Sequence, residues 1–205
     1  MPDSSKSAGL PRAESQSSTS SRLLLAAAEL FWEKGFSGAS TRELSERLGI
    51  QKASLYYHIR SKDDLLYEIS IRSLDDIQQA VVTALANAPI EGRLQALVHA
   101  HLRTALEERH MHATQLTELR SMSEERRSAV LARRDAYERT VIETIRAEQA
   151  AGRLRMDLDA RYLGLGLLNL LNWTIFWYRP EGPKAIEELA DFFCDLYING
   201  AAADR

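Results

Sequence analysis

Cysteine is almost absent from this chain of 205 residues, in which Cys194 is the only one. A single cysteine excludes an internal disulfide and any zinc module built on cysteine ligands. Proline and glycine are also sparse, with five and ten residues, and valine is scarce beside leucine, alanine, glutamate and arginine. This composition favours helix over sheet. We expect an all-α protein with one buried, inert thiol.

Catalytic signatures are missing as well. The sequence has no Gly-x-Ser-x-Gly elbow and no glycine loop of the phosphate-binding type. The Gly164–Gly166 pair lies inside an expected helix with no strand before it, so it is no dinucleotide fingerprint. His99 and His101 diverge by about 200° around a helix, which is too far for joint metal ligation. We predict no enzymatic activity, no cofactor and no metal site.

One long uncharged stretch, residues 162–178, raises the question of a membrane span. Its length is at the short limit for crossing a bilayer, and Asn169, Asn172 and Thr174 would be costly in lipid. We interpret it as the central helix of a buried bundle and expect no membrane association. The serine-rich N-terminus lacks the hydrophobic centre of a signal peptide, so we expect a cytoplasmic protein.

Helical periodicity begins near Ser20 and continues to the C-terminus. Residues 1–19 cannot bury enough apolar surface to fold, so we expect a disordered N-terminal arm. The apolar spacing and the capping signals predict about nine helices. They cover residues 20–34, 40–48, 51–58, a stretch from 61 onward, 90–109, 112–121, 124–151, 159–178 and 184–199.

Two of these helices are short and adjacent, as in a helix-turn-helix. Ser40 and Glu43 form a capping-box signature ahead of a supporting helix over residues 41–48. Gly49 and Ile50 form the turn, and a reading helix covers about residues 51–58. Residues 12–62 carry eight basic and five acidic side chains, whereas the rest of the chain is acidic. A basic N-terminal unit on an acidic body is typical of a small DNA-binding domain.

The residues of this region resemble a known family. The stretches 39–50 (ASTRELSERLGI), 54–59 (SLYYHI) and 61–65 (SKDDL) are similar to the DNA-binding domain of TetR-family repressors. The resemblance covers about residues 20–70 and includes one departure, Ile59 in place of the commoner phenylalanine. It implies a DNA-binding domain at 20–66, with three helices, and a ligand-binding and dimerisation domain at 67–205. The resemblance also implies three partners for the protein: a double-stranded DNA operator, a second copy of the chain and a small-molecule effector.

The same resemblance assigns residues to DNA contacts. Thr41 and Arg42 match contacts at the start of the supporting helix. Lys52, Ala53 and Ser54 match the positions that face the bases. Tyr56, Tyr57, His58 and Lys62 match the positions that face the DNA backbone, and their donor groups suit phosphate contacts.

Apolar side chains on the last two expected helices exceed what one small domain can cover. We expect these helices to form a four-helix contact between two chains. The side chains assigned to this interface are Leu167, Leu168, Leu171, Ile186, Leu189, Phe193 and Leu196.

The effector is the least defined part of the predicted function. Residues 177–183 (WYRPEGP) resemble a segment of TetR-type regulators of fatty-acid and sterol-ring breakdown, several of which respond to CoA thioesters. We therefore expect an apolar tunnel lined by Leu116, Trp173 and Phe176. Arginines at its mouth would bind CoA phosphates: Arg120, Arg126, Arg127 or Arg179. The resemblance implies a repressor that a small hydrophobic ligand releases from a palindromic operator. An acyl-CoA thioester and an uncharged hydrophobic compound or efflux substrate remain the two alternatives.

Overall fold

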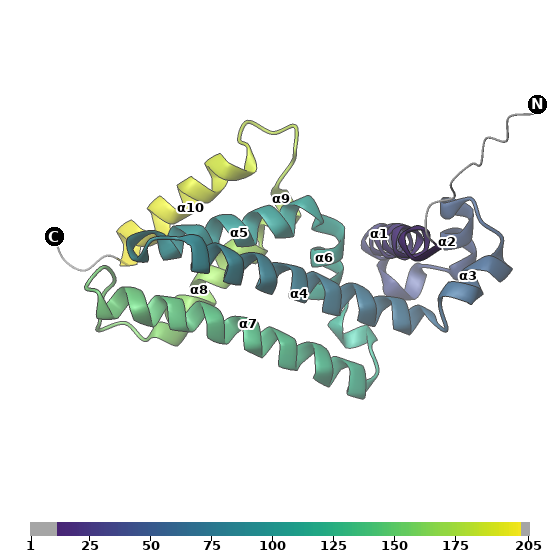
Figure 1. The fold of residues 1–205 in the computed structure, drawn as a ribbon, viewed down its shortest axis with the longest axis horizontal. Helices are drawn as coiled ribbons and strands as arrows, with labels where there is room; N and C mark the ends of the chain where they lie inside the picture. Colours follow the sequence, from purple (N-terminus) through teal and green to yellow (C-terminus); the bar gives the residue numbers. More distant parts are fainter. Residues whose placement is uncertain (1–11, 202–205) are drawn as a thin grey trace, which may run out of the picture.

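The computed structural model describes residues 12–201, with side chains placed from Ser20 to Gly200 apart from His58. The regular elements of this range are helices (Figure 1). In chain order they are α1 (Arg12–Gly38), α2 (Thr41–Leu48), α3 (Lys52–His58), α4 (Lys62–Asn87), the 3-10 helix η1 (Ile90–Gly92), α5 (Arg93–Glu107), α6 (Arg109–Thr117), the 3-10 helix η2 (Leu119–Ser121), α7 (Glu124–Ala150), α8 (Ala160–Asn172), α9 (Thr174–Trp177) and α10 (Ile186–Ala201).

The nine helices expected from the sequence are present in the described range, because α8 and α9 together make up the helix expected over residues 159–178. The interruption falls at Trp173. Directly after it, the Thr174 hydroxyl donates to the Leu171 carbonyl at 2.6 Å. Such a bond competes with the regular helical ladder.

The start of α1 differs from the expectation. This helix begins at Arg12. Residues 12–19 are therefore helical, which corrects the disordered arm expected there. Residues 1–11 lie outside the described range. Serine costs only about 0.5 kcal/mol per helical position relative to alanine. Because no proline or glycine occurs between Arg12 and Lys34, the helix extends back from its buried part. It is interrupted at Gly35, where φ is 71°, a backbone conformation that glycine adopts without steric cost.

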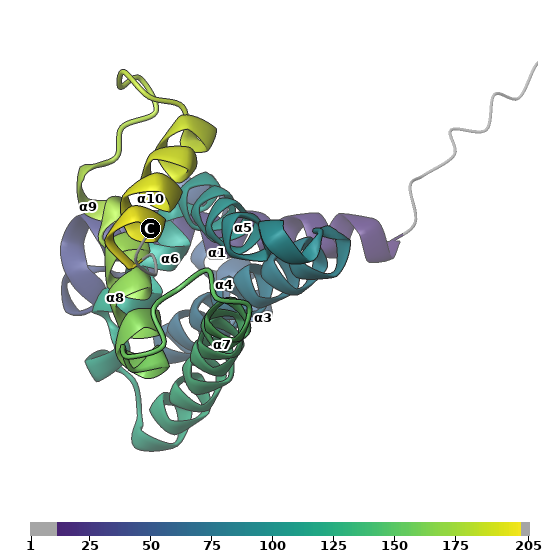
Figure 2. The same cartoon turned by 90° about the vertical axis from the view of Figure 1, so that its left-hand side faces the viewer.

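The molecule is elongated, and we call α1–α3 the head and α5–α10 the body. In Figure 1 the head lies at one end, while α10 and the C-terminal ends of α4 and α7 lie toward the other. A turn of 90° shows α8, α9 and α10 along one side of the body (Figure 2). Within residues 12–201, no helix combines the length and apolar character needed to cross a membrane.

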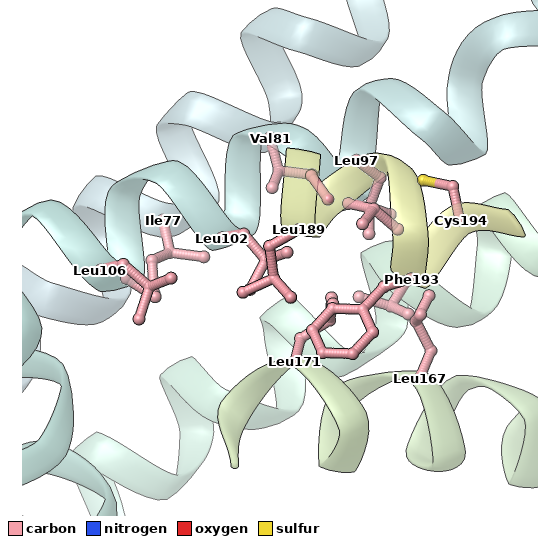
Figure 3. Packing of buried hydrophobic residues seen from close by; sticks show 14 of the residues in the cluster. Ile77, Val81, Leu97, Leu102, Leu106, Leu167, Leu171, Leu189, Phe193 and Cys194 are labelled. Carbon is pink, nitrogen blue, oxygen red and sulfur yellow. The ribbon is translucent and has the colours of Figure 1, made fainter. Parts of the chain in front are cut away.

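Two hydrophobic cores hold these parts together, and α4 contributes to both. Leu65, Leu66 and Ile69 join the head core, which also takes side chains from α6 and α7. Further along the same helix, Ile77 and Val81 join the body core. Figure 3 shows them in this core together with side chains of α5, α8 and α10. The domain boundary expected between residues 66 and 67 therefore falls inside a continuous helix.

Gly49 provides a test of the helix-turn-helix backbone. It ends α2 with φ at 65° and ψ at 28°, and its N–H donates to the Glu46 carbonyl. A Cβ would meet no atom there but would strain the left-handed backbone. Gly49→Ala should therefore lower the free energy of unfolding by about 1 kcal/mol, measured by urea denaturation.

The matched control is Gly38→Ala, because the φ of Gly38 is not positive and its Cβ would make an ordinary contact with Lys34. This variant should be as stable as the parent or slightly more stable. Equal destabilisation by the two substitutions would contradict the assigned turn geometry.

Candidate nucleic-acid interface and internal cavity

The helix-turn-helix is built from local caps and a small apolar seam. The Ser40 hydroxyl accepts from the Glu43 N–H at 3.1 Å, and the Glu43 carboxylate accepts from the Ser40 N–H at 3.2 Å, which completes the expected capping box. Leu44 of α2 and Leu55 of α3 are buried in the head core. The two helices are thereby fixed against α1, with the opposite side of α3 facing outward.

The outward side of α3 presents the residues expected to face the bases. Lys52, Ala53 and Ser54 are exposed, and Tyr57 has 82% of its surface accessible. The Lys52 ammonium lies 5.8 Å from the centroid of the Tyr56 ring. The structure thus brings these side chains onto one open surface, while the His58 side chain lies outside the described ones.

The start of α2 lies beside this surface. The hydroxyls of Thr41 and Tyr56 are 3.3 Å apart, so the two helices share a hydrogen bond at their outer edge. Arg42 is exposed and donates to Glu46 one turn further along at 2.8 Å. Because this pair is solvated, it costs little to break when another anion competes for the guanidinium.

Lys62 has different partners from those expected of a phosphate-binding side chain. Its ammonium donates to the carbonyls of Phe36 at 2.5 Å and Ala39 at 2.9 Å, and it lies 4.3 Å from the Phe36 ring centroid. The break of α1 at Gly35 leaves carbonyls near the helix end without regular partners, and a cation satisfies them. The sequence could not show this role, because the carbonyls lie more than twenty residues away.

Replacement of Lys62 therefore tests a structural role. Lys62→Met keeps the aliphatic stem but removes the three donors, so two carbonyls lose a charged partner. We expect the free energy of unfolding to fall by about 1–3 kcal/mol, measured by chemical denaturation. Lys52→Met, on the exposed side of α3, should leave stability unchanged. A Lys62 variant as stable as the parent would contradict the structural role of these two hydrogen bonds.

The body contains a cavity of about 120 Å³. Its lining comes from α4, α5, α6, α7 and α8: Leu74, Ile77, His101, His112, Gln115, Leu116, Arg134, Tyr137, Glu138, Leu165, Leu168, Asn169 and Asn172. Of the seven residues expected at the tunnel or its mouth, Leu116 alone is in this lining. The cavity is also much more polar than the apolar tunnel that we expected.

The other six expected ligand residues, which are two aromatic residues and four arginines, lie elsewhere. Arg120 and Arg179 are exposed, and Trp173 and Phe176 have 65% and 47% of their surfaces accessible. The two aromatic rings pack on each other with centroids 4.6 Å apart, outside the cavity. The buried positions Leu171, Thr174 and Tyr178 continue at helical spacing through this segment, so Trp173 and Phe176 fall on its outer side.

Polar side chains form two linked pairs inside the cavity. His101 Nδ1 lies 2.7 Å from the Tyr137 hydroxyl, and His112 Nε2 lies 3.0 Å from Asn172 Oδ1. Burial lowers the pKa of His101 to about 3, and the neighbouring His112 acts in the same direction. Burial also lowers the pKa of His112 to about 4. Both imidazoles are therefore neutral at physiological pH.

The sequence contained a signal for these residues that the interpretation did not use. His101 continues the apolar stripe of α5, four positions after Leu97 and three after Val98. A polar side chain on a core-facing stripe must find a partner in the interior. His112 and Gln115 occupy corresponding buried positions of α6.

Helix α6 also contacts the head. The Thr114 hydroxyl donates to the Ala28 carbonyl of α1 at 3.2 Å. Just beyond the helix, the Glu118 carboxylate accepts from the Phe36 N–H at 3.2 Å and from the Ser121 hydroxyl at 2.8 Å. The helix that carries three cavity residues is thus tied to the end of α1.

The assigned dimer side chains require correction. Leu167, Leu171, Leu189 and Phe193 are buried within a single chain, where they form part of the body core. They cannot contact a partner in this conformation. Leu168 and Ile186 are half-buried, whereas Leu196 is exposed as expected.

The exposed apolar face of α8–α10 is made of other side chains. They are Tyr162, Trp173, Phe176, Trp177, Phe192 and Leu196. The residues assigned from the sequence pattern lie mostly on the inner side of these helices, because large apolar residues occur on both sides. Tyr197 connects the two helices within the chain by donating to the Leu163 carbonyl at 2.9 Å.

Comparisons with known proteins agree with this architecture. A family model described as bacterial regulatory proteins of the tetR family matches residues 23–69, and one described as a tetracyclin repressor-like C-terminal domain matches residues 87–201. The transcriptional repressor KstR2 of Mycobacterium tuberculosis is 27% identical over 183 residues, which cover 87% of this chain and 90% of the relative.

Solved structures of bacterial regulators have a similar fold. The TetR-family regulator PfmR from Thermus thermophilus superposes with a TM-score of 0.80 at 36% identity, over 90% of this chain and all of the other. AibR, solved with isovaleryl coenzyme A and operator DNA, has a TM-score of 0.75 at 25% identity, with 86% and 96% of the two chains covered.

Proposed function

Because this chain belongs to the TetR family of bacterial regulatory proteins, we propose that it is a homodimeric repressor released from a near-palindromic operator by a small ligand. The observation that supports this most directly is the exposed side of α3, from Lys52 to Tyr57, on a capped helix-turn-helix. The repressor role follows the name of the KstR2 relative, which matches over most of both chains. The proposal includes no catalytic step.

On DNA, α3 enters the major groove. Lys52 and Ser54 reach the base edges, while the hydroxyls of Thr41, Tyr56 and Tyr57 contact the phosphates on either side. His58 belongs to the same set by its position in the chain. Contacts to phosphates fix the register of the protein, and contacts to base edges specify the sequence.

Lys52→Ala tests the reading surface. The variant should bind the operator about 10- to 100-fold more weakly, with the loss concentrated at one base pair if the ammonium reaches guanine O6 or N7. Gel-shift titrations with the operator and its single-base variants measure this. The matched control is Arg139→Ala, which removes one exposed positive charge from α7. Equal losses from the two variants would contradict sequence reading by α3.

Dimerisation would use the exposed apolar face of α8–α10. Six large exposed side chains on helices that lie along one side of the body (Figure 2) exceed the scattered apolar residues of an ordinary surface. A two-fold axis would bring each α8 and α10 against their copies and bury these residues in a four-helix contact. Two heads would then point in the same direction and reach two half-sites.

The double substitution Phe192→Glu with Leu196→Glu tests this face. Both side chains are about half exposed in one chain, so the monomer fold should tolerate the change. Sedimentation velocity should show monomers, and operator affinity should fall because each head binds its half-site alone. Ile90→Glu, at an even more exposed apolar position on η1, should remain a dimer. A stable dimer of the double variant would reject the assigned face.

The ligand response would act through α6. This helix lines the cavity with His112, Gln115 and Leu116, while Thr114 and Glu118 hold α1 of the head. A ligand that binds better to one position of α6 changes the relative orientation of the heads and so their match to the half-sites. The size of the response equals the difference in ligand affinity between the two conformations.

Two classes of effector remain candidates. An acyl-CoA thioester is favoured by the similarity to AibR, whose structure contains isovaleryl coenzyme A. The cavity has room for roughly eight waters, enough for a short acyl group but not for the CoA nucleotide, which would lie outside. Arg126 is engaged with Asp63 and Asp64, so exposed arginines such as Arg120 are better placed for phosphates. An uncharged hydrophobic compound is the alternative.

Titration of the protein–operator complex separates the two classes. Short acyl-CoAs should release DNA at lower concentrations than long ones, because the cavity is small. Free acids of the same chain lengths and CoA itself are the controls. Release by free acids as effective as release by thioesters, or no release by either, would remove the CoA hypothesis and leave the uncharged alternative.

A further inference from the structure

Three polar atoms inside the cavity have no hydrogen-bond partner among the described residues. They are Nε2 and Oε1 of Gln115 and Nε2 of His101. Both side chains are almost completely buried, and both line the cavity. A buried amide or imidazole left unpaired costs free energy, so such groups in an otherwise satisfied core indicate something that binds to them.

The chemical character of these atoms follows from their neighbours. If the Tyr137 hydroxyl donates to His101 Nδ1 at 2.7 Å, both the phenolic hydrogen and the ring nitrogen are satisfied. The hydrogen of the neutral imidazole then lies on Nε2 and is free to donate. Gln115 adds two amide hydrogens and one carbonyl oxygen. The cavity therefore offers more donors than acceptors, and the donors are uncharged.

The charges around the cavity are balanced. Arg134 and Glu138 of α7 both line it and are half-buried, one helical turn apart. Glu138 also lies 3.8 Å from Arg161. His101 and His112 are neutral, so Arg134 is the cation of the lining, and Glu138 one turn away offsets its charge toward an entering carboxylate. A ligand group that enters should be a neutral acceptor.

We propose that this cavity recognises an uncharged carbonyl group, as in a ketone, ester, thioester or amide, through hydrogen bonds from Gln115 and His101. The inference rests on the proposed ligand response and specifies its chemistry. It explains why two side chains keep unpaired donors in a buried site. It is compatible with a thioester as well as with an uncharged ketone, and it predicts weaker binding of free carboxylates.

Three probes of similar size and shape test the carbonyl: cyclohexyl methyl ketone, isopropylcyclohexane and cyclohexanecarboxylate. Binding to the full-length parent and to each variant is measured by ligand-observed NMR. In the parent, the side-chain amide signals of Gln115, identified by their disappearance in Gln115→Met, report contact with the probe. The ketone should shift these signals and bind about tenfold more tightly than the other two probes. Gln115→Met should abolish most of that preference.

Gln79→Met is the matched control, since Gln79 is exposed on α4 and donates to Thr83. It should retain the ketone preference. Thermal unfolding and operator binding without ligand are measured for each variant. Equal binding of hydrocarbon and ketone, tighter binding of the carboxylate, no binding of the ketone, or a preference that survives in Gln115→Met would overturn the inference. If operator binding persists in these cases, only the carbonyl assignment fails; a parent protein that binds no operator rejects the regulator itself.

Discussion

Helix α4 supplies side chains to two hydrophobic cores, and most of the molecule depends on this. Leu65 and Leu66 are fixed by the head, whereas Ile77 and Val81 are fixed by the body. Because interiors are close-packed, a displacement of one end of the helix cannot be absorbed locally and must be transmitted along it. The head is thus attached to the body by a rigid element instead of a flexible linker, and its orientation is set by how the body packs.

Helix α6 is the second connection between head and body, and it contributes polar side chains to the cavity. Thr114 and Glu118 hold the head by hydrogen bonds, while Gln115 faces the cavity with its amide unpaired. The unpaired amide makes the ligand-free conformation less stable than its packing alone would allow. A ligand that completes these hydrogen bonds stabilises one position of α6, which is the differential affinity that any ligand-driven switch requires. The unpaired polar groups therefore destabilise the ligand-free conformation, and a ligand that pairs with them would favour the bound one.

Much of the fold could be predicted from local sequence signals. The Ser40–Glu43 box, Gly49 and the spacing of Leu44 and Leu55 define the helix-turn-helix through interactions within about twenty residues. Distant partners could not be predicted in the same way. The carbonyls bound by Lys62 and the pairing of His101 with Tyr137 depend on tertiary packing.

The two misassigned surfaces have a common physical cause. Helices α8 and α10 carry large apolar residues on more than one side, so periodicity alone could not distinguish the core side from the exposed one. Leu189 and Phe193 pack inside the chain, while Phe192 and Leu196 remain outside. Trp173 and Phe176 likewise lie on the outer side of their segment, whose buried positions are Leu171, Thr174 and Tyr178.

The central claim is that two α3 helices of a dimer read a symmetric DNA site and that a ligand in the cavity prevents this. Selection of bound duplexes from fragmented genomic DNA, sequenced after several rounds in high competitor DNA, tests it most directly. The account predicts an enriched near-palindrome with half-sites one helical turn apart or a multiple of it, and depletion of that sequence when the effector is added. Enrichment of no sequence, or of an asymmetric site bound by one head, would contradict it.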